Sequence, residues 1–164
     1  MSTSDIAFTP TVKAVQARKG SRRSYARMEQ SGGWATDIDE NLADFIAGQR
    51  SFFLATANAS GQPYIQHRGG PRGFLKVLDP RTLAFADVAG NRQYISVGNI
   101  EENPKVHLFL IDYATRQRIK VWGTAKVVED DPALLARLSV PGGGKPERAM
   151  LIHVEAWDAN CPQH

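Results

Sequence analysis

The segment HRGGPRG, residues 67–73, places two arginines among three glycines between two predicted strands. Glycine lets a backbone approach a ligand closely, and exposed N–H groups with an arginine fork suit phosphate oxygens. The segment is not a Walker A loop, because it lacks Gly-Lys-Ser/Thr. It also lacks the GxGxxG spacing and following helix of a dinucleotide fingerprint. These residue types are compatible with a small anion site, but a surface loop with incidental charge would explain them as well.

A second candidate is AGNRQY, residues 89–94, where Asn91 and Arg92 follow a predicted strand and stand at the start of a helix predicted over 91–102. Helix N-termini attract anions, and Arg92 would add a charge-assisted fork. The alternative is an ordinary helix cap beside a solvated arginine.

A third candidate is the alternation of Arg116, Arg118 and Lys120 along a predicted strand, opposite Ile119 and Val121. A solvated sheet face is one explanation of these cations. A phosphate, or an aromatic ring stacked on Arg118, is the other.

The single cysteine, Cys161, excludes a disulfide within one chain and stands in a Cys-x-x-His spacing with His164. Zinc needs three or four protein ligands, and the remaining histidines are scattered over predicted strands. The sequence therefore predicts no metal site and favours a structural cysteine over a nucleophilic one.

These candidates require a scaffold, and 164 residues with 42% hydrophobic and 23% charged residues suit one globular domain. The net charge of +3 is unevenly distributed. Residues 1–31 contain six basic and two acidic residues, which gives this arm +4 and leaves −1 for the rest. The near-neutral body does not support a nucleic-acid interface. No secretory signal or 18-residue apolar run is present, so we expect a cytoplasmic protein without a membrane partner.

Short alternating segments predict a mainly β fold with six or seven antiparallel strands. Strands are expected at 51–57, 63–67, 74–79, 82–87, 105–113, 116–130 with a bulge at Gly123, and 149–160. Helices are expected on both sides of a break at Gly20, after a cap at Asp37 or Asp39, over 91–102, and from Pro132. An antiparallel barrel with N-terminal and peripheral helices fits this order.

Taken together, the segments FFLATANASGQPYIQHRGG, FLKVLDPRTLAFADVAGNRQY, IEENPKVHLFLIDY and RQRIKVWGTAKVVED resemble the pyridoxamine 5′-phosphate oxidase-like, FMN-binding split-barrel superfamily. The tail EAWDANCPQH is similar to a bacterial flavin-nucleotide-binding subgroup, whose chains continue past the position of His164. The resemblance implies an FMN-binding split β-barrel over residues 39–164, preceded by a helical arm over 1–38. It also implies a homodimer with FMN at the subunit interface, acting on a small-molecule substrate or electron donor.

The resemblance also implies which residues bind FMN. Asn91 and Arg92 match the pair that holds the FMN phosphate, and Arg118 matches a position on a later strand, in the same or the other subunit. The other implied FMN-binding residues are Gln66, His67, Arg68, Gly69, Gly70, Lys76, Asp87, Cys161 and Gln163.

The chain departs from true pyridoxamine-phosphate oxidases, because QHRGGP replaces their Arg-x-Val-Leu-Leu-Lys segment and a C-terminal Arg-x-His motif is absent. The resemblance therefore implies an FMN-dependent oxidoreductase with a different substrate. The alternatives are a non-enzymatic flavin carrier or sensor, and a deazaflavin- or haem-binding relative on the same fold.

Overall fold

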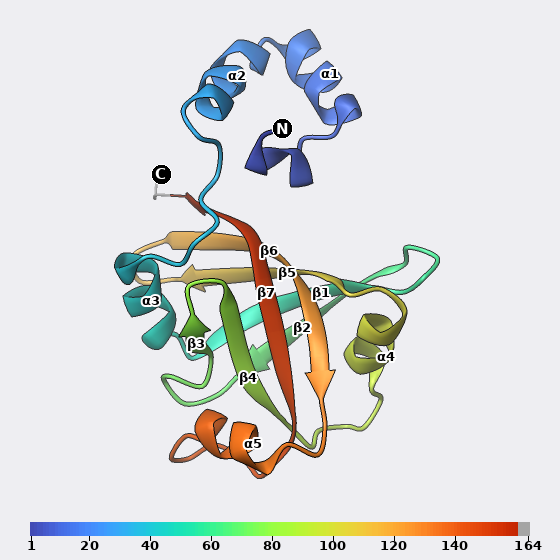
Figure 1. Ribbon diagram of the computed structural model, residues 1–164, viewed down its shortest axis with the longest axis vertical. Coiled ribbons are helices and arrows are strands. Elements are labelled where there is room, and N and C mark those ends of the chain that lie inside the picture. The colour runs from blue at the N-terminus through green and yellow to red at the C-terminus, as the bar shows by residue number, and fades with distance from the viewer. Residues whose placement is uncertain (161–164) are drawn as a thin grey trace.

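The computed structural model describes residues 1–160, which form one antiparallel sheet of seven strands with helices around it (Figure 1). The strands are β1 (Ser51–Ala57), β2 (Pro63–Gly69), β3 (Lys76–Asp79), β4 (Thr82–Val88), β5 (Lys105–Asp112), β6 (Gln117–Val128) and β7 (Pro146–Asn160). The helices are the 3₁₀-helix η1 (Thr3–Ile6) and the α-helices α1 (Pro10–Lys19), α2 (Arg22–Gln30), α3 (Glu40–Ala47), α4 (Ile95–Glu102) and α5 (Pro132–Leu138).

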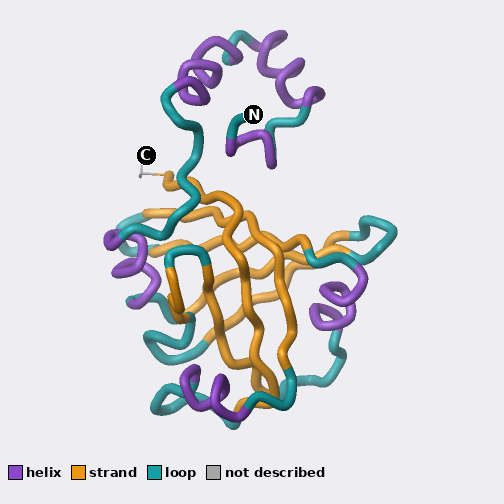
Figure 2. Tube along the Cα trace, in the orientation of Figure 1, coloured by secondary structure: helices purple, strands orange, loops and turns teal. Residues whose placement is uncertain are grey.

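The strands follow the order β2-β1-β5-β6-β7-β4-β3, and the sheet curls around an apolar core (Figure 2). The apolar run SFFLATA forms the strand predicted for it, and its alternate residues Phe52, Leu54 and Thr56 are buried. Leu42 and Ile46 of α3 join the same core, and α3 begins where the side chain of Asp39 accepts a hydrogen bond from Leu42 N. The mainly β split-barrel fold is therefore confirmed.

The barrel is not closed by a continuous ladder of backbone hydrogen bonds, because β2 and β3 are the two ends of the sheet. Side chains close it instead. The ring of Phe52 on β1 lies 5.7 Å from that of Phe74 in the β2–β3 loop and 5.3 Å from that of Phe85 on β4, between centroids. An ion pair joins Arg68 of β2 to Asp87 of β4. We call this line, where β2 meets β4 through side chains, the seam.

The bulge predicted at Gly123 is confirmed, because the register between β6 and β7 shifts between Trp122 and Gly123. A Cβ atom at position 123 would lie 2.5 Å from the carbonyl oxygen of His153. Only glycine therefore fits at this bend without displacing backbone.

Replacing Gly123 with alanine is expected to lower the free energy of unfolding by about 2 kcal/mol, because the added methyl group overpacks a fixed backbone contact. Urea unfolding followed by far-UV circular dichroism measures this loss. Gly98→Ala in α4 is the matched control, because nothing lies within 4 Å of its added Cβ. That variant should gain up to about 1 kcal/mol from helix propensity. Equal stabilities of the two variants would contradict the steric explanation.

Helices α1 and α2 stand apart from the barrel at the N-terminal end of the chain (Figure 1). The chain breaks between them at Gly20, whose φ of 90° ends α1, as predicted. The arm meets the sheet through Trp34, which stacks on Trp122 of β6 with centroids 4.4 Å apart. Within residues 1–160, no helix is long and apolar enough to span a bilayer.

Several predicted boundaries are wrong. Helix α4 begins at Ile95 rather than at residue 91, because Arg92 and Tyr94 adopt positive φ angles of 62° and 56°. Strand β3 begins at Lys76, since residues 74–75 turn into the core as part of a loop. Strand β7 already begins at Pro146, three residues before the predicted start. Arg116 has a φ of 60° in the turn before β6, so it does not share a strand face with Arg118 and Lys120.

Candidate functional site

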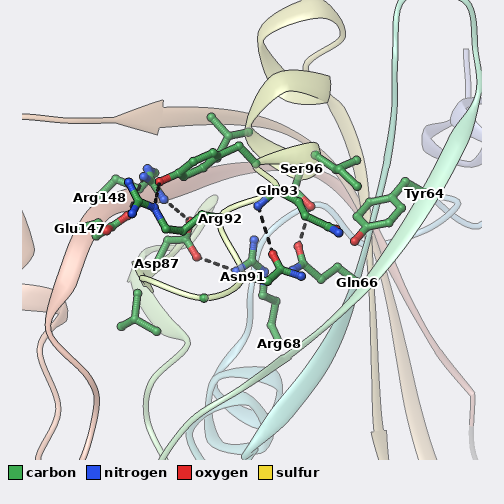
Figure 3. Close-up of a pocket in the computed structure, with 15 residues that line it drawn as sticks. Tyr64, Gln66, Arg68, Asp87, Asn91, Arg92, Gln93, Ser96, Glu147 and Arg148 are labelled. Atoms are coloured by element: carbon green, nitrogen blue, oxygen red, sulfur yellow. Dashed lines mark hydrogen bonds and ion pairs between the residues drawn. The ribbon is translucent and has the colours of Figure 1, made fainter.

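A cleft of about 160 Å³ lies between β2, the loop from β4 to α4, and the start of β7 (Figure 3). Five of the residues predicted to bind FMN line it: Gln66, Arg68, Asp87, Asn91 and Arg92. They come from two segments, 66–68 and 87–92, and the seam of the barrel brings them together.

The register of β2 against β1 decides which residues of β2 reach the cleft. Tyr64, Gln66 and Arg68 lie opposite Thr56, Leu54 and Phe52, whose side chains point into the barrel. Residues directly opposite each other in an antiparallel pair share one face of the sheet. The three polar side chains of β2 therefore point inward, at the sheet edge that borders the cleft.

Asp87 bridges two arginines at the floor of the cleft. Its Oδ1 accepts a hydrogen bond from Arg68 Nη1 at 2.6 Å, and its Oδ2 accepts one from Arg148 Nη1 at 2.8 Å. Asp87 and Arg148 are 5% and 8% exposed, so these charges are nearly removed from water. Ion pairs buried to this degree require complementary partners, and the bridge across β2, β4 and β7 supplies them.

Arg148 has further acidic partners. Its Nη2 donates to Glu147 Oε2 at 2.8 Å and its Nε lies 3.4 Å from Glu129 Oε1. Its guanidinium also lies 5.2 Å from the ring centroid of Tyr94. Burial alone would lower the pKa of Arg148. The hydrogen bonds and charges of its carboxylate partners raise the pKa by more than burial lowers it, so it lies above the ordinary arginine value. Arg148 is therefore permanently charged and held in one orientation.

The loop before α4 forms the wall of the cleft facing β2. Arg92 Nε donates to Tyr94 Oη at 3.4 Å, and both residues hold the positive φ angles noted above. Non-glycine residues in this region store strain and often mark functional sites. Tyr94 is the N-cap of α4 and makes no capping hydrogen bond with its side chain. The first turn of α4, residues 95–97, lines the cleft, so its N–H groups add positive potential there.

One donor in the cleft has no acceptor. Arg68 Nε is buried and has no hydrogen-bond partner among residues 1–160, although Arg68 Nη1 is bonded to Asp87. An unsatisfied buried donor is costly unless a ligand or water supplies the acceptor. Gln66, two residues before Arg68 on β2, is also held in place, because its Oε1 accepts a hydrogen bond from Ser96 Oγ at 2.8 Å (Figure 3). The cleft therefore offers positive charge and a free donor to an anion.

Several predicted residues lie elsewhere. Gly69 and Gly70 do not line the cleft. They line a second cavity of about 210 Å³, which the loop 139–146 also borders. Lys76 lies on β3 at the other end of the sheet from β2. His67 points to the outer face of the sheet, with its ring 5.5 Å from that of Phe53. Cys161 and Gln163 lie outside the described residues.

Arg118 also lies on the outer face, because its neighbours Ile119 and Val121 point into the core. The cleft and Arg118 therefore lie on opposite faces of the sheet within one chain. Arg118 Nε is buried without a hydrogen-bond partner among the described residues, as Arg68 Nε is.

Sequence reasoning missed Arg148, which has the most partners of the cluster. The signal that could have found it is a charged residue immediately before the apolar run AMLI. The register of β7 against β4 places this residue opposite Asp87. Tyr64 and Ser96 were also missed. Tyr64 and Gln66 stand two residues apart on β2, so a strand-face argument from Gln66 would have found Tyr64.

Solved structures share this fold. HupZ of Group A Streptococcus aligns with a TM-score of 0.61 and 22% identity, over 74% of this chain and 93% of that one. An FMN-binding protein from Syntrophomonas wolfei aligns with a TM-score of 0.54 and 12% identity, over 90% and 99%. An F420 reductase aligns with a TM-score of 0.52 and 20% identity, over 74% and 98%. No curated protein matches the sequence.

The family comparison is more specific than these likenesses in fold. The family model described as pyridoxamine 5′-phosphate oxidase matches residues 38–161. This range contains the whole barrel and each of the three segments that build the cleft. The chain therefore belongs to the pyridoxamine 5′-phosphate oxidase family.

Proposed function

We propose that the cleft binds the phosphate of FMN and that the protein is an FMN-dependent oxidoreductase. The observation that carries the proposal is the Nε of Arg68, a buried donor without a partner among the described residues, in a cleft that Arg92 and the first turn of α4 also line. A phosphate would satisfy this donor, and the guanidinium of Arg92 and the helix N-terminus would stabilise its charge. The donor set of the site fits this group.

The size of the cleft supports a second subunit. Small-molecule sites typically occupy about 300–1,000 Å³, and the cleft measures about 160 Å³. One chain therefore encloses the phosphate end of FMN and leaves the rest to be covered. A homodimer would provide that cover.

The outer face of the sheet is the surface we propose for this dimer. It carries Ile65, 65% exposed, beside Ala55 and His107 in one row across β2, β1 and β5. Arg118 lies on the same face, and its Nε has no hydrogen-bond partner among residues 1–160. In the proposed dimer, Arg118 of one subunit reaches the FMN held by the other.

When bound, FMN would supply the hydride or electron chemistry, so the protein needs no nucleophile of its own. The residues of this chain bind and orient: Arg68 and Arg92 hold the phosphate, and Gln66, fixed by Ser96, offers its amide N–H₂ to the cleft. We propose a small-molecule substrate other than pyridoxamine 5′-phosphate, and a cytoplasmic protein.

A titration tests the proposal. The purified protein should bind one FMN per chain, seen as quenched flavin fluorescence and a shifted visible spectrum. Absence of FMN binding would overturn the proposal. Parallel titrations with F420 and haem test the deazaflavin- and haem-binding alternatives, since an F420 reductase shares this fold. Anaerobic mixing with NADH or NADPH then separates an oxidoreductase, whose flavin is bleached, from a carrier or sensor, whose flavin stays oxidised.

A further inference from the structure

We propose that the second cavity binds an uncharged apolar group about the size of a six-membered ring, and that the substrate carries this group. Calling the ligand a substrate rests on the proposed function, whereas the site itself follows from the lining of the cavity. The cavity lies at the end of the barrel where α5 lies, away from the N-terminal arm (Figure 1). Its walls come from the end of β2 and the loop after it, the end of β4, and residues 138–146.

The cavity is a gap in the apolar packing of the molecule. Phe74 belongs to the main core cluster, and Val140 packs against that cluster. Leu138 belongs to a smaller cluster, against which Ala86 packs. All four line the cavity, which therefore lies where the two clusters meet. An apolar cavity of about 150 Å³ is large enough to bind benzene, so a volume of about 210 Å³ accommodates one ring with a small substituent.

The lining of the cavity selects against charge. Among residues 1–160, no charged side chain lines it, and none of the buried side-chain donors and acceptors that lack a partner belongs to it. A charged group that entered would lose its hydration without gaining a counter-charge. The cavity therefore suits a neutral ligand, in contrast to the cleft with its arginines.

The glycine-rich segment 142–144 forms the outer wall of the cavity. A Cβ atom on Gly142 would lie 3.6 Å from Cγ of Pro71, and one on Gly144 would lie 3.3 Å from Cγ1 of Val88. The segment therefore spans from the β2–β3 loop to the end of β4. Because its residues are exposed on their other side, a ligand in the cavity would lie between this wall and Phe74.

The cavity adjoins the cleft. Side chains alternate along a strand, and β4 uses this alternation: Ala86 and Val88 line the cavity, while Asp87 between them lies in the cleft. Val88 lines the cleft as well, and the pair of Asp87 with Arg68 separates the two spaces. An anion in the cleft and an apolar group in the cavity can therefore be bound side by side.

Fluorobenzene is the probe for this site, and ¹⁹F NMR of the purified full chain should show a shifted and broadened signal for it. Ala86→Leu places a larger side chain in the cavity and should weaken this binding by at least about tenfold. Ala133→Leu, at an exposed position of α5, is the matched control and should bind fluorobenzene like the wild type. If Ala86→Leu does not fold, as judged by far-UV circular dichroism, Val140→Phe fills the cavity from its other wall and should have the same effect. Wild-type protein that does not bind fluorobenzene, or a folded filling variant that binds it equally well, would overturn the inference.

Two further titrations test the charge and the place of the ligand. 4-Fluorobenzyl alcohol and 4-fluorobenzylammonium have the same shape, and the charged one should bind at least about tenfold more weakly. Saturating FMN should leave the affinity for fluorobenzene within about twofold of its value without FMN, because the two ligands occupy separate spaces. Equal affinities for the two benzyl compounds, or displacement of fluorobenzene by FMN, would overturn the inference. Wild-type protein that binds fluorobenzene but not FMN would contradict the proposed function and leave the apolar site standing.

Discussion

Replacing Arg68 with methionine is expected to weaken FMN binding by about 100-fold. The substitution removes the guanidinium of Arg68, and with it both the Nε donor and the positive charge. Hydrogen bonds to charged groups contribute about 1.5–3 kcal/mol each. A loss of about 3 kcal/mol corresponds to about 100-fold in the dissociation constant. Flavin fluorescence quenching at fixed ionic strength measures the constant.

The control for this prediction is Arg23→Met, which removes the same charge from an exposed position of α2 in the N-terminal arm. It should leave the FMN dissociation constant unchanged, because the arm lies apart from the cleft (Figure 1). Arg68→Lys should fall between the two, since an ammonium keeps the charge and loses the planar fork. A methionine variant that binds FMN as tightly as the wild type would remove Arg68 from the site.

Replacing Asp87 with alanine is expected to lower the free energy of unfolding by about 3–5 kcal/mol. The change removes the one acidic partner that Arg68 has within residues 1–160, and it takes one partner from Arg148, in a cluster where Asp87 is 5% exposed. Removing one member of a buried ion pair leaves an uncompensated charge, which is the source of this large loss. Urea unfolding, followed by tryptophan fluorescence, measures it.

Asp44→Ala is the matched change at an exposed position of α3, and it should alter the free energy of unfolding by no more than about 0.5 kcal/mol. High salt should not rescue Asp87→Ala, because the cluster is screened from solvent. Similar stabilities for the two alanine variants would mean that the buried arginines find other partners, contrary to the geometry of the seam.

The barrel could be predicted from the sequence because its signals are local. The apolar run SFFLATA has the length of a strand and predicts β1, and the glycine within RIKVWGTAKV predicts the bulge of β6. Each prediction depends on a few consecutive residues. The resemblance to a known family then placed Arg68, Asp87 and Arg92 in one region, and the structure brings them into one cleft.

The partner of Asp87 could not be predicted in this way. Arg148 follows Asp87 by 61 residues, and only the register of β4 against β7 brings the two side chains together. The residues before it, VPGGGKPE, are typical of a loop, so the strand start at Pro146 carried no periodic signal. The positive φ angles of Arg92 and Tyr94 likewise depend on tertiary contacts that propensities do not contain.

The seam has a consequence for how this barrel can change its ligand. Strands joined by a hydrogen-bonded ladder keep a spacing of about 4.8 Å whatever their side chains are. The gap between β2 and β4 is set instead by side chains, because Arg68 of β2 pairs with Asp87 and lies over the ring of Phe85, both on β4. The width of this gap therefore depends on side chains rather than on backbone hydrogen bonds. Substitutions at these few positions can adjust the opening to ligands of different breadth while the other strand pairings stay as they are.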